Sequence, residues 1–223
     1  MKNLFDNENE SFLKKLNELI KNSIQVDICV GYFKFSGWCL IVESLQDILY
    51  INNGTIRLLV GTGENNDINK KLFFDDFFHK DINLKKETQN LNKLVQFLQF
   101  GEQTNKLTVK LIPNTHSKLY IFTHENLENE NSIFIGSSNL TRNGLTNTIR
   151  ELNCYFTDKH ICDEAKNWFE QKWNLDLSKD ITSELWSSVY EKNLLKCDEY
   201  DEYYDVIEDE LEKYYYEHYY DMN

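Results

Sequence analysis

The sequence predicts an α/β fold in which a mixed, largely parallel β-sheet is flanked by helices on both faces. Short apolar runs of strand length alternate with amphipathic stretches of helical periodicity along residues 9–173. The run at 24–31 is apolar on both faces of the expected strand, as in a strand buried between two layers of helices. Such alternation is typical of a sheet covered on both sides.

Helices are predicted where apolar residues recur every three or four positions, at 9–22, 67–80, 86–100 and 160–173, and after the cap residue Ser36, at 36–49. Strands are predicted at 24–31, 56–61, 107–112, 117–123, 132–136 and 149–157. We place the main domain at residues 1–178. A helical C-terminal extension with an acidic, tyrosine-rich tail follows at 179–223.

The composition bounds the class of protein. The 223 residues are enough for one domain with a sizeable core. No run of 18 apolar residues occurs and the N-terminus is polar, so we expect neither a membrane span nor a signal peptide. The five cysteines form an odd set without metal-ligand spacing, which predicts reduced thiols, a cytoplasmic location and no metal site.

Two polar segments, each next to an apolar run, carry the chemistry. His116-Ser117-Lys118 precedes the expected strand at 117–123, and the run at 132–136 ends in Gly-Ser-Ser-Asn-Leu-Thr. Alternate residues of a strand share a face, so His116 and Lys118 are expected to point the same way. Each segment alone is common, since Gly-Ser-Ser-Asn is also an ordinary turn signal. Together they favour a site that acts on a phosphodiester.

These residue types suit that reaction without a metal or organic cofactor. Neutral imidazole is a nucleophile near neutral pH and imidazolium is an acid, so His116 fits both steps. Lys118 supplies a fixed positive charge for a non-bridging oxygen. Asn139 and Ser137 add hydrogen-bond donors.

The two segments together resemble the signature of the phospholipase D superfamily, and most closely its nuclease branch. In that branch the Gly-Ser-x-Asn-Leu-Thr segment is followed about a dozen residues later by a Glu, which here is Glu151. The resemblance implies that His116 attacks phosphorus and that Glu151 supports the histidine. Many members carry an Asp at the position of Thr123, and this departure weakens a phospholipase function more than a nuclease function.

The superfamily builds its site from two His-Lys sets around a two-fold axis, and this chain has one. Its other histidines, at positions 79, 124, 160 and 218, have no lysine two residues later. The resemblance therefore implies a homodimer with a shared active site. One His116 forms a phosphohistidine intermediate and the partner's His116 protonates the leaving oxygen.

The expected substrate is nucleic acid, with DNA favoured over RNA. The net charge of −13 argues against a DNA-binding protein, so local cations must matter. Arg142 and Lys34 are the predicted phosphate contacts, although an exposed loop arginine explains Arg142 equally well. The resulting hypothesis is a metal-independent endonuclease, with restriction or phage defence as its setting. A non-cleaving binding module and a phospholipid hydrolase are the alternatives.

The C-terminal tail differs in character from the rest of the chain. Residues 197–223 hold eleven acidic residues, one lysine and eight tyrosines. One interpretation is an amphipathic helix that docks Val206, Ile207 and Leu211 on the main domain. The other is a polyanion that imitates DNA and covers the substrate-binding surface.

Overall fold

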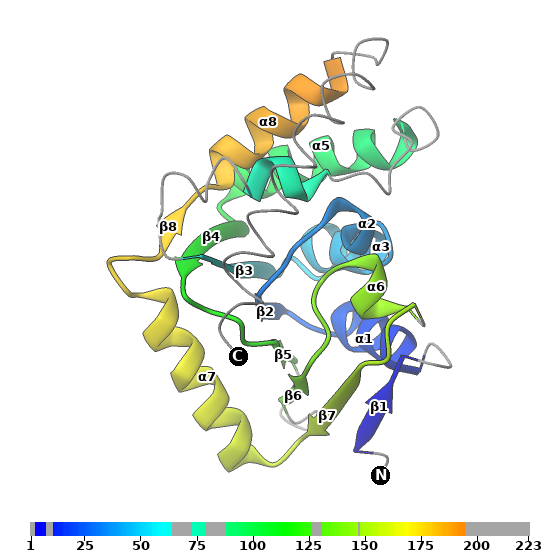
Figure 1. The fold of residues 1–223 in the computed structure, drawn as a ribbon, viewed down its shortest axis with the longest axis vertical. Helices are drawn as coiled ribbons and strands as arrows, with labels where there is room; N and C mark the ends of the chain where they lie inside the picture. Colours follow the sequence, from blue (N-terminus) through cyan, green and yellow to red (C-terminus); the bar gives the residue numbers. More distant parts are fainter. Residues whose placement is uncertain are drawn as a thin grey trace, which may run out of the picture.

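The computed structural model describes residues 3–7, 11–63, 73–78, 88–125, 131–146 and 148–194, and these form one eight-stranded sheet with helices on both faces (Figure 1). The strand order is β1-β7-β6-β5-β2-β3-β4-β8. The strands are β1 Leu4–Asp6, β2 Gln25–Val30, β3 Thr55–Thr62, β4 Leu107–Pro113, β5 Leu119–Thr123, β6 Ser132–Gly136, β7 Leu152–Phe156 and β8 Lys179–Asp180. All six predicted strands are present, and β1 and β8 at the two edges were not predicted.

The sheet is mixed, as predicted, but it is mostly antiparallel rather than largely parallel. Among the described residues only the pairings β2–β3 and β3–β4 are parallel, while the other five strand pairings are antiparallel. Parallel neighbours need a long crossover connection, which helices provide on either side of β3. The connection from β4 to β5 is short, so β5 runs back along β2. From there the chain continues as an antiparallel meander through β6 and β7.

Helices lie on both faces of the sheet. They are α1 Ser11–Lys21, α2 Phe35–Trp38, α3 Val42–Gln46, the π-helical turn η1 Asp47–Ile51, α5 Thr88–Thr104, α6 Arg142–Leu145, α7 Lys159–Trp173 and α8 Thr182–Leu194. The predicted helix at 36–49 is interrupted at Ile41 (φ −126°, ψ 0°), where the backbone leaves the helical region and α2 is separated from α3. η1 follows α3 directly and differs from it in having π-helical hydrogen bonds. Residues 73–77 of the predicted helix at 67–80 are helical and Phe78 forms a turn, while residues 67–72, 79 and 80 lie outside the described part of the chain.

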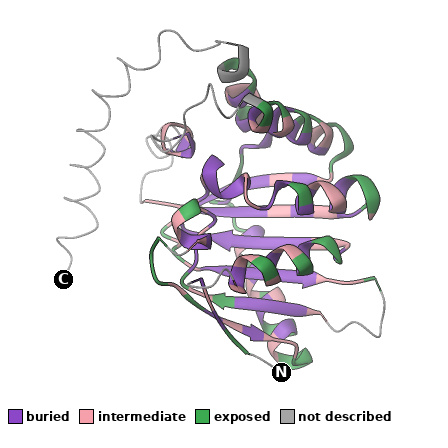
Figure 2. Cartoon of the chain, turned by 90° about the vertical axis from the view of Figure 1, so that its right-hand side faces the viewer, coloured by how far each residue is buried: buried purple, intermediate pink, exposed green. Residues whose placement is uncertain are grey.

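The two faces have separate apolar cores. The larger core lies under α1, α3 and α5 and includes an edge-to-face aromatic group of Phe12, Tyr120 and Phe134. The smaller core lies under α7, which contributes Phe169 and Trp173. In Figure 1 α7 runs along one side of the sheet while α1, α2 and α3 lie on the other, and Figure 2 shows the strands buried between them. Helices therefore cover both faces, as predicted.

The C-terminal part of the described chain belongs to the same body. β8 pairs with β4, and α8 packs on α5 with Leu185 and Val189 in the larger core. The division at residue 178 stays a prediction. The tail at 197–223, with both interpretations of it, lies outside the described residues. Within the described ranges, no helix is both long and apolar enough to cross a membrane.

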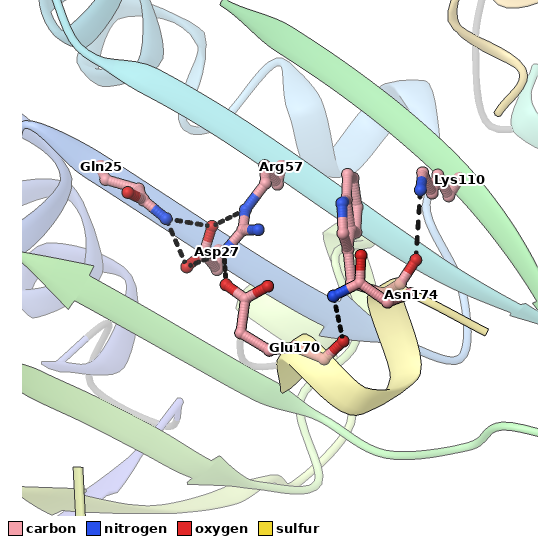
Figure 3. Close-up of polar contacts among 7 residues, drawn as sticks. Gln25, Asp27, Arg57, Lys110, Glu170 and Asn174 are labelled. Atoms are coloured by element: carbon pink, nitrogen blue, oxygen red, sulfur yellow. Dashed lines mark hydrogen bonds and ion pairs between the residues drawn. The ribbon is translucent and has the colours of Figure 1, made fainter. Parts of the chain in front are cut away.

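Arg57 forms ion pairs with a buried carboxylate within the sheet and with a carboxylate on α7 (Figure 3). Asp27 on β2 is fully buried directly opposite Arg57 on β3, and the guanidinium donates to both carboxylate oxygens at 2.7 and 2.9 Å. Arg57 also reaches Glu170 on α7 at 2.5 Å and lies over the rings of Phe169 and Trp173 at 5.0 and 5.2 Å. One guanidinium thus joins two strands and a helix.

Loss of this guanidinium is expected to destabilise the fold strongly. Arg57→Met leaves the buried carboxylate of Asp27 without its charge partner, which costs about 3–5 kcal/mol. Glu170→Gln alters only a partly exposed contact and is expected to cost about 1 kcal/mol or less. Urea unfolding at pH 7 measures both. Similar midpoints for the two variants would contradict the prediction.

Candidate active site

His116 and Lys118 lie side by side in the turn that joins β4 to β5. The Lys118 ammonium nitrogen is 2.9 Å from His116 Nδ1 and donates to the His116 carbonyl oxygen at 2.6 Å. The imidazole is exposed, whereas only 7% of Lys118 is exposed. An ammonium has no acceptor, so its contact makes Nδ1 an acceptor and places the imidazole proton on Nε2. That tautomer presents a proton donor at the surface of the site.

The close packing of this pair depends on Gly31 at the carboxyl end of β2. A Cβ atom at residue 31 would lie 2.7 Å from His116 Cδ2 and 3.3 Å from both His116 Nε2 and Lys118 Nζ. Cys29, two residues earlier, faces the core under α7. Because alternate residues of a strand share a face, the vacant side-chain position of Gly31 faces the same way. The His116–Lys118 pair therefore lies toward the α7 face of the sheet.

Asn139 joins this end of β2 to the loop after β6. Its side-chain oxygen accepts a hydrogen bond from Tyr32 N at 3.0 Å, and the Leu140 amide donates to the Tyr32 carbonyl at 3.2 Å. Phe33 and Leu140 form a parallel bridge. With its oxygen used by the backbone, the Asn139 side chain offers its NH₂ group as the donor to a substrate.

The two serines before Asn139 are bound to β7. The Ser137 hydroxyl accepts from Leu152 N at 3.1 Å, and at 3.4 Å it contacts the Leu152 carbonyl. Ser138 is fully buried, and its amide and hydroxyl are both bonded to Asn153. Ser137 thus holds the loop in place, and its predicted contact with substrate stays a prediction. Asn153, also fully buried, has the same holding role and carried no signal in the sequence.

Asn7, near the N-terminus, positions the backbone of Glu151. The Glu151 backbone amide donates to Asn7 Oδ1 at 3.0 Å, while the Asn7 side-chain NH₂ donates to the carbonyls of Ile149, at 2.7 Å, and Thr146. The half-buried Glu151 carboxylate acts on Lys118 by opposing its loss of charge. No local pattern singles out Asn7, because its contact joins residues 144 positions apart in the chain.

The two predicted phosphate contacts are placed differently. Arg142 begins α6, directly after the loop that holds Asn139, and its side chain is exposed. Lys34 follows the strand end at Tyr32, but its ammonium forms an ion pair with Asp76 at 2.9 Å. A phosphate bound by Lys34 would have to compete with that carboxylate. Both roles stay predictions.

The environment sets the charge of the His-Lys pair. Burial lowers the pKa of Lys118 to about 8. The electrostatic effects of Glu151 and, after it, Cys29 act in the opposite direction and raise this pKa. Partial burial, with the nearby Lys118 charge, lowers the pKa of His116, so its imidazole is neutral at pH 7. Burial raises the pKa of Cys29 to about 12, which makes this thiol unreactive. Within the described residues, no three His, Cys, Asp or Glu side chains group to hold a metal ion.

The comparison with protein families decides the membership of this chain. Residues 16–173 match the model of a family described as cardiolipin synthase, PLD-like domain. The chain belongs to the phospholipase D superfamily. Members of this superfamily act on phosphodiesters, and the matched segment contains His116, Lys118, Asn139 and Glu151. A search of curated protein sequences gave no match.

Solved structures of the superfamily share the fold. Nuc from Salmonella typhimurium, a phospholipase D family member, superposes with a TM-score of 0.50 at 11% identity, over 79% of this chain and 95% of Nuc. NucT from Helicobacter pylori gives 0.50 at 15% identity, over 80% of this chain and 98% of NucT. Phosphatidylserine synthase from Haemophilus influenzae gives 0.53 at 14% identity, over 86% of this chain but only 45% of that enzyme. The superfamily fold thus corresponds to nearly all of Nuc and NucT and to about half of the synthase.

Binding of a phosphodiester is expected to weaken as the pH rises through about 8. Lys118 is charged below its pKa of about 8 and neutral above it, so the cation is lost on the alkaline side. In a His116→Ala background, the Kd for an oligonucleotide should rise about tenfold from neutral to strongly alkaline buffer. Fluorescence anisotropy measures this. Lys118→Arg in the same background should abolish the rise, since arginine stays charged. A rise that persists with arginine would assign the titration to another group.

Proposed function

We propose that this protein is a metal-independent phosphodiesterase that cleaves nucleic acid, DNA rather than RNA, as an endonuclease. The observation that carries the proposal is the exposed imidazole of His116, whose Nδ1 lies 2.9 Å from the ammonium nitrogen of the buried Lys118. This pair offers a nucleophile or acid together with a positive charge for a phosphoryl oxygen. Asn139 adds a donor from the neighbouring loop.

The reaction proceeds in two displacements. Lys118 Nζ first leaves His116 Nδ1 for a phosphoryl oxygen, so that the imidazole proton can move to Nδ1 and Nε2 of this protomer can attack phosphorus. The bond to the leaving oxygen breaks as the partner's His116, which has taken a proton from solvent and is in its imidazolium form, donates a proton to that oxygen. The phosphohistidine is then hydrolysed. The imidazole that lost its proton takes one from water, the hydroxide attacks phosphorus, and the P–N bond breaks. Lys118 and Asn139 stabilise the charge on the phosphoryl oxygens in both steps.

The comparisons support a nucleic acid over a phospholipid. The chain corresponds to nearly the whole of Nuc and NucT, whereas it spans less than half of the phosphatidylserine synthase. The Gly-Ser-Ser-Asn-Leu-Thr segment also resembles the nuclease branch. Phospholipid hydrolysis or transfer is the second candidate, favoured by the synthase superposition. Release of headgroup from phospholipid vesicles, without cleavage of plasmid, would select it.

Cleavage of plasmid DNA is expected to continue in excess EDTA, because Lys118 and Asn139 provide the contacts that a metal would otherwise make. His116→Ala should lose turnover by at least about a thousandfold while it still binds DNA. Lys118→Ala should lose turnover and also DNA binding, because it removes the positive charge that contacts the phosphate. Agarose gels and anisotropy give the readouts. Activity abolished by EDTA and restored by Mg²⁺ would refute the mechanism.

A homodimer would supply the second His-Lys pair. Leu4, Ile135 and Leu152 are large apolar side chains, 53, 43 and 52% exposed. Leu4 and Ile135 are both paired with Cys154 across neighbouring strands, and Ile135 is paired with Leu119 of the core under α7, so they lie on that face of the sheet. The His116–Lys118 pair lies toward the same face. A second copy that covers these side chains would approach the site.

Ile135→Lys is therefore expected to weaken dimerisation about 30-fold, equivalent to about 2 kcal/mol. Activity should fall at concentrations where the wild-type dimer is active. Ile51→Lys is the matched control, since Ile51 is 74% exposed at the end of η1, in the opposite helical layer. Sedimentation equilibrium measures the association. A monomeric wild type that still turns over would exclude the shared site.

The proposed biological role rests on the proposed nuclease activity. Restriction or phage defence in the cytoplasm remains the proposed role. If wild type binds DNA without cutting it, the protein is instead a non-cleaving nucleic-acid-binding module.

The acidic tail is proposed to regulate access to the site. Deletion of residues 197–223 should then raise DNA affinity at physiological ionic strength, where the Debye length is about 8 Å. Unchanged affinity with lower stability would make the tail a packing element.

A further inference from the structure

An aromatic ring that the mechanism does not use lies beside the predicted nucleophile. The rings of Tyr32 and His116 are perpendicular, with centroids 6.1 Å apart and an interplanar angle of 85°. Tyr32 is half-buried and His116 is exposed, so both rings lie at the surface of the site. A substrate in contact with the imidazole would therefore meet the tyrosine ring as well.

The two phenylalanines that follow Tyr32 lie in a core, whereas Tyr32 lies at the candidate site. In the run Tyr32-Phe33-Lys34-Phe35, both phenylalanines are buried in the larger core, 3 and 0% exposed, and contact Phe77. Tyr32 is not a member of either apolar core.

The Tyr32 backbone is fixed on both sides. Its amide donates to Asn139 Oδ1 at 3.0 Å, and its carbonyl accepts from Leu140 at 3.2 Å. The preceding Gly31 is packed against the His116–Lys118 pair. A tyrosine side chain has two rotatable bonds, so a fixed backbone gives a well-defined ring position at low entropic cost.

We propose that Tyr32 is a specificity-determining residue that stacks on the nucleobase of a nucleotide adjoining the scissile phosphate. The inference rests on the proposed nucleic acid substrate. Attack requires phosphorus to lie about 3–3.5 Å from His116 Nε2. A base joined to that phosphate through one sugar then lies at the distance of the neighbouring tyrosine ring. Stacking tolerates every base, because each has a π-face, so the residue selects nucleotides without selecting sequence.

The experiment uses oligonucleotides with one cleavable linkage, all other linkages being methylphosphonates. One substrate carries all its bases, and two others replace the base on either side of the cleavable linkage by an abasic tetrahydrofuran. For the intact substrate, Tyr32→Leu should lower kcat/KM about tenfold, mainly through KM. On one of the abasic substrates, wild type should lose the same factor and Tyr32→Leu should lose no more. Tyr32→Phe and Tyr32→Trp, which keep a planar ring, should stay close to wild type.

Tyr50→Leu is the matched control, since Tyr50 is a tyrosine at the surface, 44% exposed, that lies in η1 at the other end of the sheet. It should retain wild-type kinetics on all substrates. Equal kcat/KM for Tyr32→Leu and wild type would overturn the proposal. An equal loss on the intact and both abasic substrates would also overturn it, because the ring would then only position His116. If wild type cleaves none of the oligonucleotides, the proposed function itself fails, and this inference with it.

Discussion

His116 and Lys118 occupy the volume that a side chain at residue 31 would fill. Any Cβ at this position would lie only 2.7 Å from His116 Cδ2, too close for the imidazole to keep its place. The same strand end holds Asn139 and the loop after β6 through the backbone of Tyr32. The arrangement of the site thus depends on the backbone of Gly31 and Tyr32. The His-Lys pair packs against Gly31, and the loop that contains Asn139 is hydrogen-bonded to Tyr32.

The sequence allowed the central elements and the motif to be predicted, because both carry local patterns. Apolar runs mark β2 to β7, and the spacing of His116 and Lys118 marks the reacting pair. The prediction that the strands are largely parallel was wrong, because a short apolar run has the same pattern in a parallel and an antiparallel sheet. The edge strands β1 and β8 were missed because three and two residues are too few to show a period.

The polar residues that support the site were also beyond sequence reasoning. Asn7 and Asn153 act through hydrogen bonds to distant backbone groups, and nothing near them in the sequence distinguishes them from other asparagines. Asp27 is a charged residue within the otherwise buried strand β2. Its buried carboxylate is stable there because the strand register sets it opposite Arg57, and the register is known only from the fold.

The contact between Asn7 and Glu151 has a consequence for the order of folding. The β5–β6 hairpin joins segments that lie close together in the chain, and β2, β3 and β4 are each nearer to their partner in sequence than β1 is to β7, so these pairings can form earlier. The β1–β7 pairing closes a loop of almost the whole matched domain, and long loops close late. Glu151 therefore reaches its place only when this last edge strand docks. During synthesis the candidate site therefore stays incomplete until β7 has left the ribosome, so under the proposed function a partly made chain would not cleave nucleic acid.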